Sequence, residues 1–160
     1  LGNIGKRLAR LARGLNMNII GFDVMPIPDD FAREVGLIKA DVDTLISSAD
    51  FISFHVPLTE GTRHLVNSER LSKMKKNVYL INTSRGEIID EDALYNALKE
   101  KKIAGAALDV FEKEPATGNK LTTLPNVVCT PHVGAQTKEA QSLAANIIAE
   151  KIIMILRGVI

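Results

Sequence analysis

Short apolar segments typical of buried strands alternate with helical segments along almost the whole chain. The strand-like segments cover residues 18–23, 51–54, 77–81, 103–110 and 126–130. The helical segments begin at Gly2 and then cover residues 29–35, 41–48, 67–74, 91–101 and 137–156. Strands that alternate with helices form a mostly parallel sheet with helices on its faces. The sequence therefore predicts an α/β fold of the Rossmann type, doubly wound around a sheet with covered faces.

Composition limits the partners of this chain of 160 residues, a length that suits one domain. The net charge is +1 with acids and bases interspersed, so we expect no nucleic-acid binding, which needs a clustered basic face. The most apolar region, residues 143–160, contains Glu150, Lys151 and Arg157, so we expect no membrane span.

The single cysteine, Cys129, lies in a strand-like segment and is interpreted as a buried small hydrophobe. Neither a disulfide framework nor a CxxC zinc pattern is present, so we expect no metal site. These features, and the lack of a recognisable signal peptide, favour a cytoplasmic location.

The start of the chain has half of a glycine fingerprint for dinucleotides. Gly2 and Gly5 open a helix whose residues Ile4, Leu8, Leu11 and Leu15 share one face, and its free backbone N–H groups can bind a pyrophosphate. No strand precedes this turn, so we expect the first Rossmann strand to be truncated.

Asp23 ends the next strand-like segment, where an acid binds the adenosine ribose hydroxyls. The alternative is a turn residue at a strand end. An acid there repels a 2′-phosphate and residues 24–27 contain no Arg or Lys, which favours NAD over NADP.

Three polar residues follow successive predicted strands: Arg85, Glu114 and His132. Ligands bind outside the carboxyl ends of parallel strands, so we expect these side chains to face one cleft. Arg85 can clamp a carboxylate, His132 can transfer a proton, and Glu114 can orient and stabilise the charged imidazole. This set serves hydride transfer to a 2-oxo acid. The alternatives are a solvated arginine, an exposed loop glutamate and a structural histidine.

Two further histidines have weaker patterns. His55 follows a strand, but no acid follows it at a comparable position, so it is interpreted as structural or cofactor-adjacent. His64 lies in a polar stretch and is predicted to be a surface or loop histidine.

Five motifs together resemble the D-isomer-specific 2-hydroxyacid dehydrogenases. They are residues 2–5 (GNIG), 55–59 (HVPLT), 82–86 (NTSRG), 108–115 (LDVFEKEP) and 130–134 (TPHVG). The resemblance implies that Arg85 binds the substrate carboxylate and that Glu114 pairs with the acid/base His132. It also implies that residues 1–160 are the NAD-binding domain, without a substrate domain, of an enzyme that forms homodimers through this domain.

The resemblance implies a larger set of NAD contacts. Thr83, Asp109, His132 and Gly134 surround the nicotinamide, and Pro57 and Thr59 lie near the adenosine half. The complete set expected at the NAD site is Gly2, Asn3, Ile4, Gly5, Asp23, His55, Val56, Pro57, Thr59, Thr83, Ser84, Arg85, Asp109, His132 and Gly134.

Within the family, residues 134–141 (GAQTKEAQ) are most similar to D-3-phosphoglycerate dehydrogenases, which catalyse the first step of phosphorylated serine synthesis. Glyoxylate/hydroxypyruvate reductases and D-lactate dehydrogenases are the alternative substrate classes. An NAD(H)-binding corepressor that acts through protein contacts is the alternative of another class.

The last helical segment, residues 137–156, has apolar residues around much of its circumference. This pattern predicts more than one buried face, part of it covered by the substrate domain or a second subunit. The residues are Leu143, Ile147, Ile148, Ile152, Ile153, Ile155 and Leu156.

Overall fold

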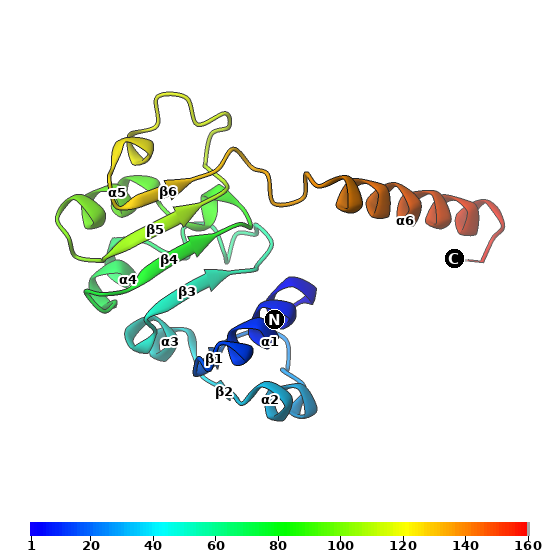
Figure 1. Cartoon of the computed structure of the whole chain (residues 1–160), viewed down its shortest axis with the longest axis horizontal. Coiled ribbons are helices and arrows are strands. Elements are labelled where there is room, and N and C mark those ends of the chain that lie inside the picture. Colours follow the sequence, from blue (N-terminus) through cyan, green and yellow to red (C-terminus); the bar gives the residue numbers. More distant parts are fainter. Residues whose placement is uncertain (160) are drawn as a thin grey trace.

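The computed structural model describes residues 1–159 and contains two parallel sheets (Figure 1). One sheet pairs β1 (Ile19–Gly21) with β2 (Leu37–Lys39). The other has the order β3 (Phe51–Phe54), β4 (Tyr79–Asn82), β5 (Gly105–Leu108) and β6 (Val127–Cys129). Every pairing between these strands is parallel, which confirms the predicted α/β class.

The helices lie between the strands at the predicted places. They are α1 (Asn3–Gly14), α2 (Asp29–Val35), α3 (Val42–Ser48), α4 (Ser68–Lys73), α5 (Glu91–Lys99) and α6 (Lys138–Leu156). The strand β2 and the short 3-10 helices η1 (Gly86–Ile88) and η2 (Lys120–Thr123) were not predicted. In β2 only Leu37 is buried, while Ile38 and Lys39 are exposed, so this segment lacks the apolar run that marks a buried strand.

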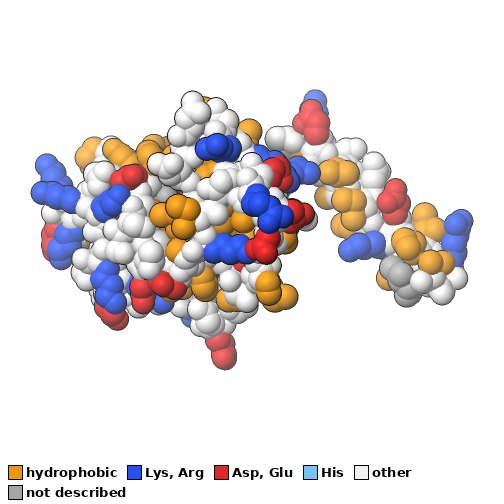
Figure 2. Space-filling model, turned by 90° about the horizontal axis from the view of Figure 1, so that it is seen from below, with side chains coloured by type: hydrophobic (Ala, Val, Ile, Leu, Met, Phe, Trp, Pro, Cys, Tyr) orange, Lys and Arg blue, Asp and Glu red, His pale blue; other side chains and the backbone are white. Residues whose placement is uncertain are grey.

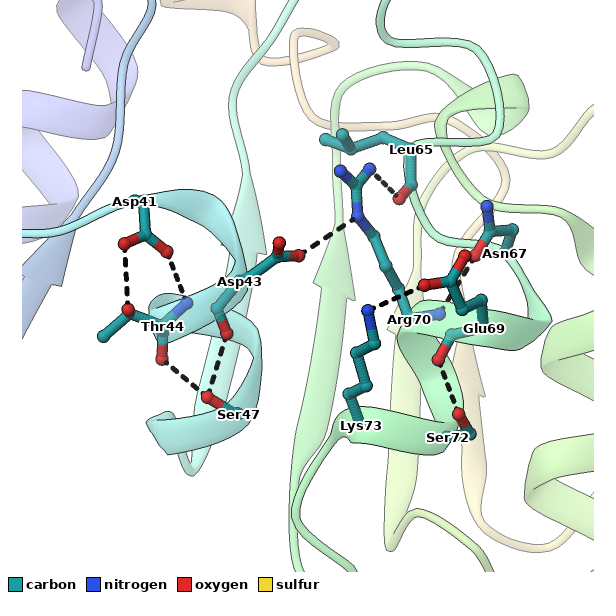
Figure 3. Close-up of polar contacts among 10 residues, drawn as sticks. All are labelled: Asp41, Asp43, Thr44, Ser47, Leu65, Asn67, Glu69, Arg70, Ser72 and Lys73. Carbon is teal, nitrogen blue, oxygen red and sulfur yellow. Dashed lines mark hydrogen bonds and ion pairs between the residues drawn. The ribbon is translucent and has the colours of Figure 1, made fainter.

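Side-chain caps fix the starts of α3 and α4 (Figure 3). The carboxylate of Asp41 accepts the N–H of Thr44 at 2.7 Å, and the amide oxygen of Asn67 accepts the N–H of Arg70 at 3.0 Å. Such caps satisfy N–H groups that have no partner inside the helix. Arg70 also lies 3.9 Å from the carboxylate of Asp43, so it links α4 to α3.

The main core lies between one face of the four-stranded sheet and α3, α4 and α5. It includes Ile52, Phe54, Leu80, Ala106 and Leu108 from the strands and Ile46, Leu71, Leu94 and Leu98 from the helices. On the opposite face Phe51, Tyr79 and Val128 are 55%, 46% and 68% exposed. The prediction of covered faces is therefore wrong for this face within residues 1–159. The longest helix, α6, extends away from the sheet (Figure 1).

A second, smaller core joins α1, α2, β1 and β2 through Ala9, Phe31, Val35 and Leu37. No pairing connects β1 with β3 in the described part of the chain. In the usual Rossmann order, 3-2-1-4-5-6, the first strand lies between the strands at these two positions. Residues 1–159 therefore contain no strand at that position.

Two helices carry exposed apolar surfaces. In α1 the buried residues are Gly5 and Ala9, while the predicted apolar face is exposed: Ile4, Leu8, Leu11 and Leu15. In α6 no residue is buried, and Figure 2 shows this helix with apolar side chains outside the main body. The apolar side chains of α6 are thus left uncovered by this chain, as expected if the substrate domain or a second subunit covers them, and the identity of that partner stays a prediction. None of the helices in residues 1–159 combines the length and apolarity that a bilayer crossing needs.

Candidate active site

A pocket of about 240 Å³ lies beyond the carboxyl ends of β4, β5 and β6. It is lined by Arg85, Gly86, Glu87, Val110, Phe111, Glu112, Glu114 and His132. The three residues that the sequence placed in one cleft are all among them. Their convergence is thus observed, and their catalytic roles stay predictions.

His132 and Glu114 form a hydrogen-bonded pair in this pocket. Nδ1 of His132 lies 2.7 Å from Oε2 of Glu114, and Oε1 of Glu114 accepts the N–H of Phe111 at 3.2 Å. The hydrogen bond from His132 lowers the pKa of Glu114, a slight burial opposes this shift, and the Phe111 N–H adds to it. An ionised Glu114 holds the imidazole through Nδ1, so the other ring nitrogen, Nε2, stays available to a ligand.

The loop that carries Arg85 is organised by the buried Asn82 at the end of β4. Its Nδ2 donates to the carbonyl of Arg85 at 2.8 Å, and its Oδ1 accepts the N–H and the hydroxyl of Ser84 at 3.1 and 2.8 Å. The Arg85 side chain is exposed and donates to the carbonyl of Ser84 at 2.6 Å. Sequence reasoning missed Asn82, although a polar residue at the end of an apolar strand was a usable signal.

Asp109 holds the turn that presents His132. It is buried and accepts the N–H groups of Val133 and Gly134, both at 2.9 Å, and the hydroxyl of Thr130. Burial acts to raise the pKa of Asp109, but these hydrogen bonds outweigh burial and the pKa is lowered. His132 has a φ of 54°, a left-handed conformation uncommon outside glycine. The anchored turn keeps that backbone in place.

Gly86 allows the loops that carry Arg85 and Glu114 to touch through their backbones. A Cβ at this position would lie 1.9 Å from the carbonyl carbon of Phe111 and 2.4 Å from the nitrogen of Glu112. Only glycine permits such an approach. The Arg85 loop is therefore fixed directly against the loop that leads to Glu114.

The predicted nucleotide residues gather at the start of α1. Gly2 is the N-cap without a side-chain cap, the first turn has no acid, and nothing lies within 4 Å of a Cβ built at Gly2. Asn3 and Ile4 are exposed in this turn. Asp23, beyond the end of β1, lies beside the backbone of Leu1 and accepts the N–H of Met25 at 2.9 Å. The turn and the acid thus lie together.

The loop after β3 lies next to this turn. His55 is half-buried, its Nε2 lies 3.0 Å from the hydroxyl of Ser53, and its ring is close to Gly5. Burial lowers the pKa of His55. The other residues expected at the NAD site follow β3 or β4 in loops; they are Val56, Pro57, Thr59 and Thr83.

Comparison with known proteins decides the family. Residues 1–134 match the family described as D-isomer specific 2-hydroxyacid dehydrogenase, NAD binding domain. This chain belongs to that family.

Two curated relatives and one solved structure illustrate the similarity. A D-3-phosphoglycerate dehydrogenase of Methanocaldococcus jannaschii is 51% identical over 99% of this chain and 30% of its own length. A glyoxylate reductase of Korarchaeum cryptofilum is 44% identical over 99% of this chain and 48% of its own length. The crystal structure of Aquifex aeolicus D-lactate dehydrogenase complexed with NAD and lactic acid has a TM-score of 0.88 and 35% identity over 98% of this chain and 51% of that chain. The chain thus spans at most about half the length of these relatives.

The residues of this 2-hydroxyacid dehydrogenase domain fit its cofactor, NAD. The uncapped start of α1 offers free N–H groups in open space, which suits a pyrophosphate. Asp23 lies beside this turn. It also lines a second pocket of about 310 Å³, whose other lining residues include Phe22, Val24, Met25 and Lys39. Among residues 1–159 no cluster of three or more His, Cys, Asp or Glu is arranged to hold a metal ion.

His64 is exposed in a loop, as predicted, and it makes one further contact. Its side chain is partly exposed, but its Nε2 lies 3.1 Å from Oε1 of Glu112, which lines the dehydrogenase pocket. The two residues are 48 positions apart, so no local pattern could have revealed this contact.

Proposed function

We propose that this chain is the NAD-binding part of an oxidoreductase that transfers a hydride between NAD(H) and a D-2-hydroxy acid or its 2-oxo acid. The observation that carries this proposal is the His132–Glu114 pair, joined at 2.7 Å, in one pocket with Arg85. The cation matches the carboxylate of a 2-oxo acid, and the neighbouring acid/base pair matches its carbonyl oxygen.

Each side chain has a defined part in this reaction. Bound NADH supplies the hydride that reaches C2 of the 2-oxo acid. Arg85 holds the substrate carboxylate through its planar guanidinium, and His132 gives a proton from Nε2 to the carbonyl oxygen. The ionised Glu114 orients the ring and stabilises the imidazolium before transfer. In the oxidation direction the same nitrogen takes the proton back.

The substrate that we propose is D-3-phosphoglycerate, which would place the enzyme at the first step of phosphorylated serine synthesis. The 51% identity to a D-3-phosphoglycerate dehydrogenase supports it, as does the similarity of residues 134–141. The pocket lining contains one arginine, Arg85, beside the carboxylates of Glu87, Glu112 and Glu114. A substrate phosphate would therefore need cations from the substrate domain. Glyoxylate, hydroxypyruvate and D-lactate are the alternative substrates.

A comparison of kcat/KM in the full-length enzyme tests the substrate. D-3-phosphoglycerate with NAD should give a higher kcat/KM than D-lactate with NAD. In the reverse direction, glyoxylate and hydroxypyruvate with NADH should react more slowly than the phosphorylated oxo acid. A preference for an unphosphorylated substrate would replace D-3-phosphoglycerate, whereas no turnover of any 2-hydroxy or 2-oxo acid would favour the corepressor-like alternative.

We further propose a cytoplasmic homodimer that pairs through this domain. The exposed apolar side chains of α1 and α6 support a protein contact at these helices. Part of this surface is available to the substrate domain, since the relatives are longer than this chain.

A further inference from the structure

His64 connects the two loops that carry the catalytic candidates. Its backbone N–H donates to the carbonyl of Glu87, in the turn after Arg85, at 2.8 Å. Its side chain reaches the other loop, where Nε2 lies 3.1 Å from Oε1 of Glu112. One residue thus binds both the Arg85 loop and the Glu114 loop.

Glu112 is also tied to the start of α5. Its N–H donates to Oε1 of Glu91 at 2.8 Å, and its own Oε1 accepts the N–H of Glu91 at 3.3 Å. Oε2 of Glu91 in turn accepts Nδ2 of Asn119 at 2.6 Å. A carboxylate at a helix N-terminus is favourable, because unpaired N–H groups and the helix dipole point toward it.

These contacts surround the backbone that places Glu114. The Phe111 N–H, which holds Oε1 of Glu114, belongs to the residue directly before Glu112. If the Glu112 backbone moves, this N–H moves with it. Glu114 then loses the fixed position from which it reaches His132 at 2.7 Å.

We propose that Glu112 is a positioning residue: it holds the Glu114 loop against His64 and the start of α5, and so keeps Glu114 in hydrogen-bond reach of His132. This role rests on the proposed dehydrogenase function. Glu112 acts through Glu114 and transfers no proton itself.

The tautomer of His132 gives a readout that does not depend on turnover. While Glu114 accepts from Nδ1, the neutral ring carries its proton on Nδ1. The ¹⁵N shifts of selectively labelled histidine distinguish an Nδ1–H from an Nε2–H ring. In the 160-residue chain, Glu112→Ala should therefore shift His132 from Nδ1–H toward Nε2–H.

Turnover of the full-length enzyme gives the second readout. Misplacement of a catalytic group away from the chemistry can cost about 100-fold, so Glu112→Ala should lower kcat roughly 10- to 100-fold. The KM values for NAD and for the hydroxy acid should stay within about twofold, because Glu112 binds neither. Glu112→Gln keeps an acceptor for the Glu91 N–H and should restore most of the Nδ1–H signal.

Two variants distinguish a positioning role of Glu112 from a general disturbance of the loop. Lys113→Ala changes an exposed neighbour on the same loop and should leave both readouts at wild-type values. His64 has a φ of 48°, a conformation that asparagine also tolerates, so His64→Asn keeps the backbone but is too short to reach Glu112. His64→Asn should shift the His132 tautomer in the same direction as Glu112→Ala. It provides the same test if Glu112→Ala does not fold.

An unchanged His132 tautomer in folded Glu112→Ala or His64→Asn overturns the positioning role, whatever happens to turnover. A raised KM for the hydroxy acid with an unchanged kcat also overturns it, because Glu112 would then be a substrate contact. Absence of turnover in the wild-type enzyme would instead refute the proposed function, while the tautomer measurement still tests Glu112.

Discussion

At the scale of single residues, the two nitrogens of His132 have different environments. Nδ1 is hydrogen-bonded to Glu114, and we propose that Nε2 exchanges the proton with a substrate oxygen. His132→Ala in the full-length enzyme should lower kcat by about 10²–10⁴-fold, the usual contribution of general acid–base catalysis. NADH affinity, measured by calorimetry, should stay nearly unchanged. A decrease in kcat of less than tenfold would mean that another group transfers the proton.

Glu114 should set the pH dependence of turnover. Its pKa is lowered mainly by the hydrogen bond from His132, so it is ionised at neutral pH. The charged pair with His132 therefore persists at neutral pH and is lost only as acid protonates Glu114. Glu114→Gln removes this charged partner, so the pH–rate profile of the variant should differ from that of the wild-type enzyme.

The control for this profile is Glu87→Gln, which removes a pocket carboxylate outside the His132 pair. Its pH–rate profile should match that of the wild-type enzyme. If Glu114→Gln and wild type also give the same profile, Glu114 has no part in the proton transfer.

Asp23 should decide between the two nicotinamide cofactors. Its carboxylate can accept the ribose hydroxyls and repels a 2′-phosphate. A hydrogen bond to a charged group contributes enough for roughly a tenfold change in affinity or more, so Asp23→Ala should weaken NAD binding and narrow its advantage over NADP. Calorimetric titration of both cofactors measures this. Asp29→Ala, which removes an acid paired with Lys39, is the matched control.

At the scale of elements, the contact between the Arg85 and Glu114 loops depends on Gly86. A Cβ there would meet the Phe111 backbone at 1.9 Å, and backbone cannot rotate away as a side chain can. Gly86→Ala should therefore separate the loops and destabilise the fold by about 1–3 kcal/mol or more. Urea unfolding measures the loss.

Gly14→Ala is the control, because nothing lies within 4 Å of a Cβ at the end of α1. Alanine favours helix over glycine, so this variant should be neutral or stabilised. Equal stability of Gly86→Ala and Gly14→Ala would show that the two loops are not held together by this contact.

At the scale of the whole molecule, the exposed apolar surfaces of α1 and α6 should drive self-association of the isolated chain. Contiguous exposed apolar surface marks contact sites or aggregation. Sedimentation velocity should show species larger than a monomer of 17.4 kDa as concentration rises. Ile155→Glu should lower the fraction of these larger species more than Ala145→Glu does, since Ile155 presents more apolar surface on the same exposed helix. A monomer at all concentrations would contradict the homodimer proposal for this domain.

Much of the local structure could be read from the sequence. The helix predicted at residues 91–101 does begin at Glu91, where the carboxylate of Asp90 caps it by accepting the N–H of Ala93 at 3.0 Å. Thr137 begins α6 in the same way, through the N–H of Ala140 at 3.1 Å. Strand ends were less accurate: the segment predicted at residues 103–110 is paired only over Gly105–Leu108, because pairing depends on the neighbouring strand.

The sequence by itself determined the α/β class, the positions of the helices and of every strand except β2, and the meeting of Arg85, Glu114 and His132 beyond the sheet. These follow from hydrophobic period and from the fixed direction of parallel strands. Only the tertiary structure decided that the apolar face of α1 is exposed, that Gly86 touches Phe111, and that His64 reaches Glu112. Periodicity records which residues share a face, whereas the covering of that face and contacts between distant loops depend on packing.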